Sequence, residues 1–138
     1  MDEFPVVYSY SRAHALADGV LMDAGDLARE AGFRVPVALT AGAWADCVAW
    51  SEADERGGAV GQSEAGRLWD VLFLARHAAL LHGRAALLAE GQRHDRVAFV
   101  VLRVPRGKRR AERAELAVHI GPGDAGEPVI TLMLPNED

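Results

Sequence analysis

Residues 96–134 read RVAFVVLRVPRGKRRAERAELAVHIGPGDAGEPVITLML, and this stretch decides the fold. Three runs in it are rich in β-branched residues or alternate apolar with polar side chains, as strands do: 97–104, 116–120 and 129–134. The connections at 105–113 and 121–128 are short enough for hairpins. The stretch therefore predicts a three-stranded antiparallel sheet, one face of which needs a cover of helices.

The first two-thirds of the chain are predicted to be mainly helical. Hydroxyl and acidic residues that favour helix N-termini precede several short helical stretches, and glycines follow them. Helices are expected over 12–17 (capped by Ser9 or Ser11), from Asp23 or Asp26 to Gly32, and from Thr40 onward. Residues 4–8 and 20–22 are expected to be extended, 33–39 to be an edge strand or a connector because of Pro36, and 55–62 to be a loop.

The strongest helical signal lies at residues 64–81. The middle turns, 68–75, are almost continuously apolar, which predicts a central and mostly buried helix. Gly83 is expected to break or kink it before a further helical segment at 84–90. The fold class expected from these elements is α+β, with a helical N-terminal two-thirds packed on a C-terminal three-stranded antiparallel sheet.

The composition predicts a single globular domain over residues 1–138, because 50% of the residues are hydrophobic and 25% are charged. A net charge of −5 argues against general attraction to nucleic acids or anionic membranes. Cys47 is the only cysteine, so an intrachain disulfide is excluded. The start of the chain lacks an apolar signal segment, and no apolar run approaches the ~20 residues of a membrane span. A cytoplasmic protein is expected.

Six basic residues lie within the predicted hairpin connection and its flanks, at 103–113: Arg103, Arg106, Lys108, Arg109, Arg110 and Arg113. A hairpin tip with this charge predicts contact with a phosphate backbone or with an acidic protein surface. The charges have no aromatic residue between them, so a platform for base stacking is missing. The other interpretation is a solvated turn whose charges oppose aggregation.

Two polar groups of residues allow a ligand-binding hypothesis. Arg67, Asp70, Arg76 and His77 interrupt the apolar helix, and a buried polar group must be paired. Structural pairing is one interpretation, and a cleft against the N-terminal segment is the other. The loop at 121–128 adds two carboxylates to the second interpretation. Its candidate residues are Tyr8, Tyr10, Arg12, Asp70, Asp124 and Glu127.

Catalytic residues, metal ligands and cofactors are not predicted. Cys47 shares an apolar stripe with Trp44 and Val48, which favours core packing over a reactive thiol. The histidines include no pair at the i, i+4 spacing that places two metal ligands on one helical face: His14, His77, His82, His94 and His119. The loop at 121–128 lacks the lysine and hydroxyl residue of a phosphate loop.

Four segments are familiar as a set: YSYSRAHALADGVL (8–21), RLWDVL (67–72), HIGPGD (119–124) and GEPVIT (126–131). Together they resemble an uncharacterised family of small proteins, a domain of unknown function, carried on bacterial plasmids, integrative elements and phages. The resemblance covers nearly the whole chain and supplies no catalytic residue. It implies a mobile-element accessory protein that acts by protein–protein binding, in size and charge similar to anti-defence inhibitors of the anti-CRISPR or anti-restriction type.

Residues 8–11, followed by a short helix and Gly19-Val20-Leu21, are also similar to the opening of ADP-ribosyltransferase-like domains. In that family a late glutamate stabilises the ribosyl cation, and Glu127 would match it. The usual strand-borne Arg or His is absent at 6–9, and Arg12 takes a helical position instead. The first alternative function is therefore an enzyme or binder for a nucleotide-type ligand. The second is a nucleic-acid binder that uses residues 103–113, and the oligomeric state stays open.

Overall fold

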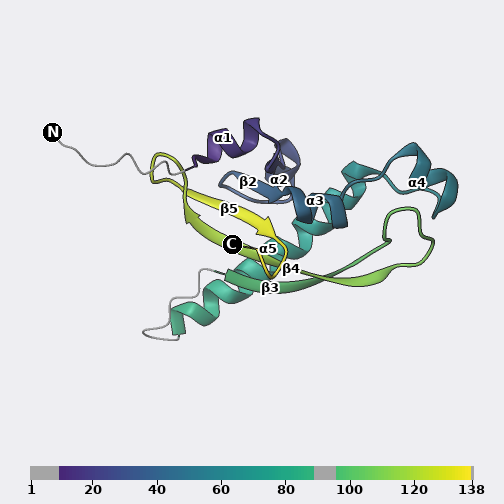
Figure 1. Cartoon of the computed structure of the whole chain (residues 1–138). Coiled ribbons are helices and arrows are strands. Elements are labelled where there is room, and N and C mark those ends of the chain that lie inside the picture. The colour runs from purple at the N-terminus through teal and green to yellow at the C-terminus, as the bar shows by residue number, and fades with distance from the viewer. Residues whose placement is uncertain (1–9, 89–95, 138) are drawn as a thin grey trace.

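The computed structural model describes residues 10–88 and 96–137, and its centre is a five-stranded mixed sheet (Figure 1). The strand order is β1-β2-β5-β4-β3. The strands are β1 Leu21–Asp23, β2 Val37–Thr40, β3 Arg96–Arg103, β4 Glu112–Pro122 and β5 Pro128–Met133. An α+β fold was the right class, and the predicted hairpins β3–β4 and β4–β5 are present. The prediction of a three-stranded antiparallel sheet is wrong, because two N-terminal strands extend it.

Strand β2 lies inside the sheet, where it pairs parallel with β5 and antiparallel with β1. The sequence predicted an edge strand or a connector there, because Pro36 has no N–H to donate. Pro36 precedes the strand, however, and its carbonyl oxygen accepts a 2.9 Å hydrogen bond from the N–H of Ile130. Val37, Ala38 and Leu39 are all buried, as the residues of an interior strand are expected to be.

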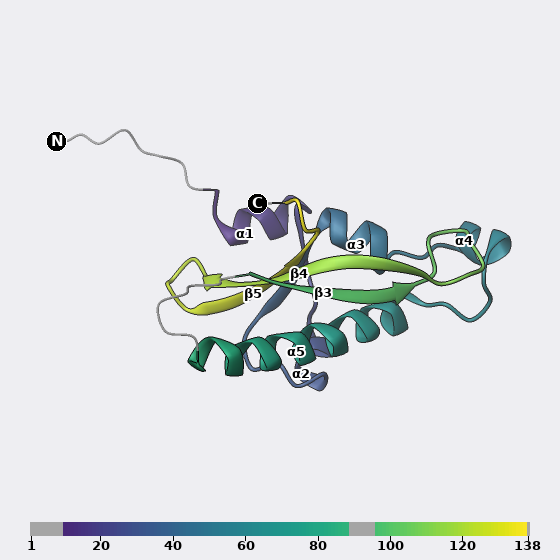
Figure 2. The same ribbon diagram turned by 90° about the horizontal axis from the view of Figure 1, so that it is seen from below.

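The helices are short and separated, apart from the last. They are α1 Arg12–Ala17, α2 Asp26–Glu30, α3 Ala41–Cys47, α4 Glu52–Gly57 and α5 Glu64–Leu88. Figure 2 shows α5 along one face of the sheet together with α2, and α1 and α3 on the opposite face. A helical N-terminal two-thirds was therefore a wrong prediction, since β1 and β2 divide that part of the chain.

Helix starts follow the local capping residues in α1 and α3 but not in α2. The hydroxyl of Ser11 accepts from the N–H of His14 at 3.0 Å, and that of Thr40 accepts from Ala43 at 3.1 Å, so α1 and α3 begin as predicted. Helix α2 instead begins after Gly25, which has φ +64° and no capping side chain. The Asp23 carboxylate accepts from the N–H of Gly25 at 3.0 Å, which shapes the turn rather than the helix.

Helix α4 falls partly in the predicted loop at 55–62. It begins with a capping box, in which Ser51 accepts from the N–H of Asp54 at 3.2 Å and Asp54 accepts from that of Ser51 at 2.7 Å. The signal was present in the sequence as Ser51-Glu52-Ala53-Asp54. The glycines at 57, 58 and 61 obscured it because they suggest a loop throughout.

Helix α5 buries one face only. Leu68, Val71, Leu72 and Ala75 belong to the hydrophobic core against the sheet, whereas Phe73 is 58% exposed. The prediction of a mostly buried helix is wrong because the sheet covers a single side of it. The predicted break at Gly83 is also wrong, since α5 continues to Leu88. The strand predicted at 4–8 lies outside the described residues.

Within residues 10–88 and 96–137, none of the helices combines the length and the apolar character that crossing a membrane requires.

Candidate functional site

Three of the six residues of the ligand-binding hypothesis meet where α1 contacts the β4–β5 turn. The carboxylate of Asp124 accepts from the backbone N–H groups of Arg12 at 2.7 Å and Ala13 at 3.0 Å. These hydrogen bonds, with the positive charge of Arg12 as a smaller contribution, lower the pKa of Asp124. Glu127 lies in the same turn, where its carboxylate accepts from the N–H of Ala125 at 3.0 Å.

The guanidinium of Arg12 is directed toward the sheet. It donates to the hydroxyl of Thr131 and to the carbonyl of Ile130, each at 2.8 Å, and burial lowers its pKa. An open hollow of about 460 Å³ lies beside it, lined in part by Tyr10 and Asp124. Because Arg12 and Asp124 bond to backbone and to Thr131, their contacts hold α1 on the sheet.

The remaining candidates of that hypothesis lie elsewhere. The Tyr10 hydroxyl donates to the carboxylate of Asp18, on the exposed side of α1. Asp70 is on α5, across the sheet from α1 (Figure 2), so the predicted cleft joining Tyr10, Asp70 and Glu127 does not form among the described residues. Tyr8 lies outside them.

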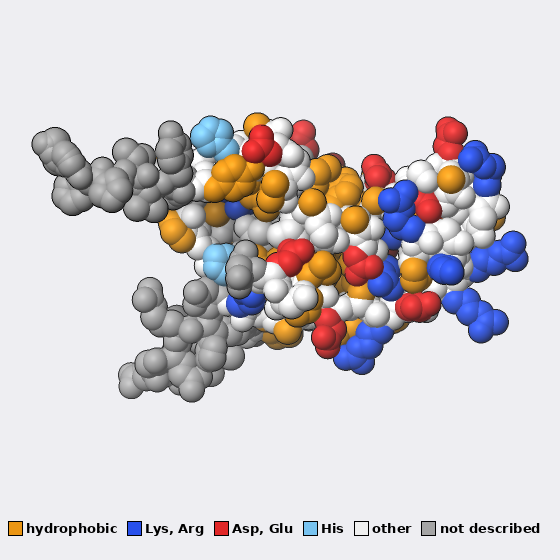
Figure 3. Space-filling view, in the orientation of Figure 1, with side chains coloured by type: hydrophobic (Ala, Val, Ile, Leu, Met, Phe, Trp, Pro, Cys, Tyr) orange, Lys and Arg blue, Asp and Glu red, His pale blue; other side chains and the backbone are white. Residues whose placement is uncertain are grey.

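The basic connection between β3 and β4 forms a tip at one end of the molecule, where Lys and Arg side chains gather (Figure 3). Two of its cations are paired: Arg103 with Asp46 at 2.9 Å, and Arg106 with Asp54 at 2.8 Å. Within the described part of the chain the other four are exposed and form no ion pair: Lys108, Arg109, Arg110 and Arg113.

Helix α4 holds this tip in place. The N–H of Ala59 donates to the carbonyl of Lys108 at 2.8 Å. A Cβ atom on Gly58 would lie 2.4 Å from the same carbonyl oxygen, so the contact requires glycine. The exposed cations are therefore presented from a supported turn.

Asp54 joins the α4 capping box to this tip, so acid is expected to weaken their contact. The backbone N–H of Ser51, and to a smaller extent Arg106, lower the pKa of Asp54 in the folded protein. A carboxylate with a lowered folded pKa stabilises the protein above its unfolded pKa, and the stabilisation is lost as pH falls through the folded pKa. Asp54→Asn is therefore expected to have a lower melting temperature than the native chain at neutral pH, and the difference is expected to shrink in acid.

Melting curves of both proteins from pH 7 downward measure this. Asp26→Asn provides the control, because Asp26 is an exposed helical carboxylate without a side-chain hydrogen bond to another described residue. A difference between Asp54→Asn and the native chain that stays constant with pH would contradict the assignment.

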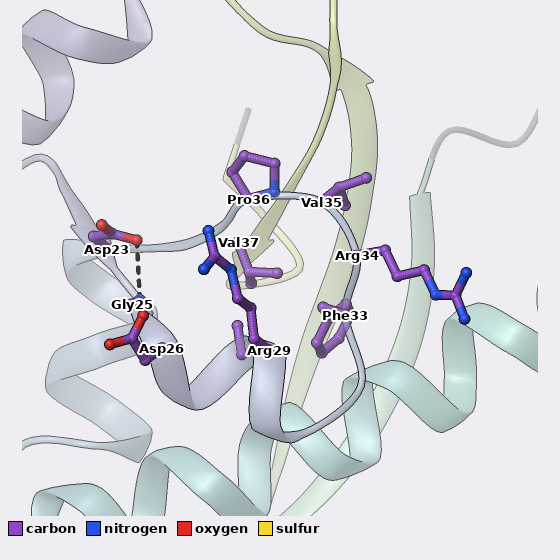
Figure 4. A pocket seen from close by; sticks show the side chains of 10 residues that line it. Asp23, Gly25, Asp26, Arg29, Phe33, Arg34, Val35, Pro36 and Val37 are labelled. Carbon is purple, nitrogen blue, oxygen red and sulfur yellow. Dashed lines mark hydrogen bonds between the residues drawn. The ribbon is translucent and has the colours of Figure 1, made fainter.

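A second hollow, of about 530 Å³, surrounds the segment between β1 and β2 (Figure 4). Asp23 and Asp26 lie at one side of it, Arg29 reaches toward Pro36, and Arg34 points away. Its charged side chains are exposed and belong to the protein surface. The buried unpartnered polar atom found in the described residues lies elsewhere, on Arg67.

Helix α5 carries a stripe of large apolar side chains on its solvent side. Trp69, Phe73, Leu80 and Leu81 are all exposed, and their spacing places them on one side of the helix. We call these four residues the α5 outer face. Sequence reasoning missed it, although Asp70, Arg76 and His77 were a signal: these polar interruptions are exposed too, and mark the side that the sheet leaves uncovered.

Arg67, near the start of α5, is buried and joins three segments. Its Nε donates to the carbonyl of Val48 at 3.0 Å, and its Nη1 to the carbonyl of Val104 at 2.8 Å and to the side-chain oxygen of Gln62 at 2.9 Å. The guanidinium also stacks on Trp50, with Cζ 4.9 Å from the ring centroid. Burial lowers its pKa, as expected for a cation withdrawn from water.

Cys47 lies in the core beside this guanidinium. Burial raises the pKa of its thiol to about 12, so the sulfur is protonated at neutral pH. The apolar stripe correctly predicted a buried position. Among the described residues, no group of three or more His, Cys, Asp and Glu side chains is placed to hold a metal ion.

The chain belongs to a family of unknown function, DUF6573, whose family model matches residues 2–138. The sequence prediction of membership in an uncharacterised family is confirmed by this match. No curated protein and no solved structure matches the chain.

Proposed function

We propose that this chain is an accessory protein of a bacterial mobile element, which acts in the cytoplasm by binding another protein through the α5 outer face. The observation that carries the proposal is the exposure of Trp69, Phe73, Leu80 and Leu81 in one stripe. Exposed apolar side chains are ordinary when scattered, whereas a contiguous patch marks a contact surface. Aromatic residues are enriched among those that contribute most to protein–protein binding.

The partner has the chemistry that this stripe selects. The four side chains are uncharged, so the partner offers an apolar surface or groove long enough to cover three turns of helix. Asp70, Arg76 and His77 flank the stripe and suit a polar rim around an apolar centre. The resemblance of the sequence to proteins of plasmids and phages supports a host target, and we propose an anti-defence role against a CRISPR or restriction nuclease complex.

A photo-crosslinking amino acid at position 73, expressed in bacteria, tests this directly. We expect a covalent adduct with a different protein, because Phe73 lies in the middle of the stripe. A crosslinker at Val60 is the matched control, since this side chain is 86% exposed and lies outside α5. The variant Phe73→Asp is expected to abolish retention of the same partner, and Val60→Asp to leave it unchanged.

The outcomes separate the alternatives. An adduct formed with a second copy of the chain, or equal labelling from positions 60 and 73, would overturn the proposal. A defence assay on cells that express the chain adds the biological readout: the native chain is expected to restore phage plating, and Phe73→Asp is not.

Nucleic-acid binding by the hairpin tip is the second candidate. Four exposed cations on a supported turn favour it, since cations that contact phosphates supply most non-specific affinity. A polyanion bound at the tip would leave the adducts at position 73 unchanged. For a nucleotide-type ligand the described residues add no favouring observation, because Arg12 and Asp124 already bond to the protein.

A further inference from the structure

A partly enclosed cavity lies beside Arg67, between α5 and the end of β3. Its volume is about 190 Å³, equal to about six water molecules of the liquid. Polar side chains that line it are Cys47, Gln62, Arg67, Asp70 and Arg103. Most of the remaining lining is apolar and comes from α5 and β3, with Ala111 just before the start of β4. The cavity therefore combines an apolar wall with a concentrated polar side.

Arg67 has hydrogen-bonding capacity left over in this place. The residue is 5% exposed, and its Nη2 atom has no hydrogen-bond partner within the described residues. The other two nitrogens are occupied by Val48, Val104 and Gln62, and stacking on Trp50 uses the face of the guanidinium rather than its N–H edge. A buried N–H without an acceptor costs free energy, so Nη2 presents an unmet donor to this cavity.

The charge of Arg67 is also uncompensated locally. Its acceptors in the described chain are two carbonyls and an amide oxygen, all neutral. Arg103, the other cation of the lining, is already paired with Asp46 at 2.9 Å. The Cys47 thiol is protonated and contributes no negative charge. A buried charge is normally paired, so the site lacks one negative charge.

We propose that this cavity is a binding site for a carboxylate, which accepts a hydrogen bond from Nη2 of Arg67 and neutralises its charge. A carboxylate carries the single negative charge that balances one guanidinium. A phosphate dianion would bring a second charge close to Asp70, which is exposed at the rim. The volume accommodates a short aliphatic acid such as acetate or succinate. This inference does not rest on the protein-binding function.

Titration of the full-length protein with sodium acetate and sodium succinate tests the site. The readout is the NMR signal of the Trp50 indole N–H, because this group donates to Glu55 at 2.9 Å and its ring lies against Arg67. Trp50→Phe assigns the signal among the three tryptophans. Sodium chloride at equal ionic strength and sodium phosphate are the comparison probes.

We expect a saturable shift of the Trp50 signal with both carboxylates and none with chloride. Phosphate is expected to bind more weakly than acetate. Absence of a saturable shift with either carboxylate would overturn the site. Phosphate binding as tight as that of acetate would overturn the assignment of a carboxylate.

Variants separate a local site from a general salt effect. Arg67 also supports the fold, so the informative change is Ala111→Leu, which fills the cavity from its exposed side and leaves Arg67 in place. We expect it to weaken acetate binding roughly tenfold or more, a loss typical of a blocked small-ligand site. Ala45→Leu, at an exposed position on α3, is the matched control and is expected to bind acetate normally. Equal affinity in the two variants would contradict the proposal.

Discussion

Leu132→Ala is expected to lower the free energy of unfolding by about 2–5 kcal/mol, the range measured when a leucine is truncated in a packed core. Leu132 lies on β5, the middle strand of the sheet, and has no exposed surface. Its neighbour in the β4–β5 register is the buried Val118, and both side chains belong to the hydrophobic core. The melting temperature is expected to fall by roughly 10 °C, which calorimetry or circular dichroism would measure.

Leu102→Ala is the matched control for that experiment. Leu102 is also a strand leucine, on the edge strand β3, and is 70% exposed. Its truncation is expected to change stability by about 0.5 kcal/mol or less, as exposed substitutions usually do. Similar losses in the two variants would be incompatible with β5 as the buried centre of the sheet.

Arg67→Leu is expected to destabilise the protein by about 3 kcal/mol. Leucine replaces a guanidinium that donates to the carbonyls of Val48 and Val104, and each buried acceptor left without a donor costs about 1–3 kcal/mol. The contact with Trp50 is lost as well. Relief from burying a charge offsets part of this cost, which is why the expected loss is smaller than the sum.

Urea unfolding measures this difference, with Arg109→Leu as the control, since Arg109 is exposed on the hairpin tip. Arg109→Leu is expected to leave the midpoint almost unchanged. If the Arg67→Leu variant were as stable as the native chain, the buried charge would cost as much as its hydrogen bonds contribute. Arg67 would then have no net structural role.

Local sequence signals were reliable where neighbours along the chain satisfy one another. Ser11 and Thr40 start helices because their hydroxyls accept from N–H groups three residues on, a contact that depends on no other segment. The β3–β4 and β4–β5 hairpins were predictable for the same reason, since each pairs adjacent runs through a short turn. The basic tip follows from its position in the first of these hairpins.

The candidate sites were predictable only in part. Arg67 and Asp70 were recognisable as polar interruptions of an apolar helix, but the acceptors of Arg67 come from positions 48, 62 and 104. Arg12 and Asp124 were named together in one hypothesis, and they do meet, yet as an anchor for α1. Asp70 was grouped with them wrongly, because spacing along the chain carries no information on which face of a sheet a helix will cover.

The sequence by itself determined the α+β class, the two C-terminal hairpins, the starts of α1 and α3, and the buried position of Cys47. These depend on side-chain periodicity and on contacts between near neighbours in the chain. Only the tertiary structure decided that β2 joins β5 in parallel, that α5 leaves Phe73 in solvent, and that Arg67 keeps an unmet donor in a cavity. The physical reason is that strand pairing and burial are set by segments distant in sequence, whose approach no local pattern specifies.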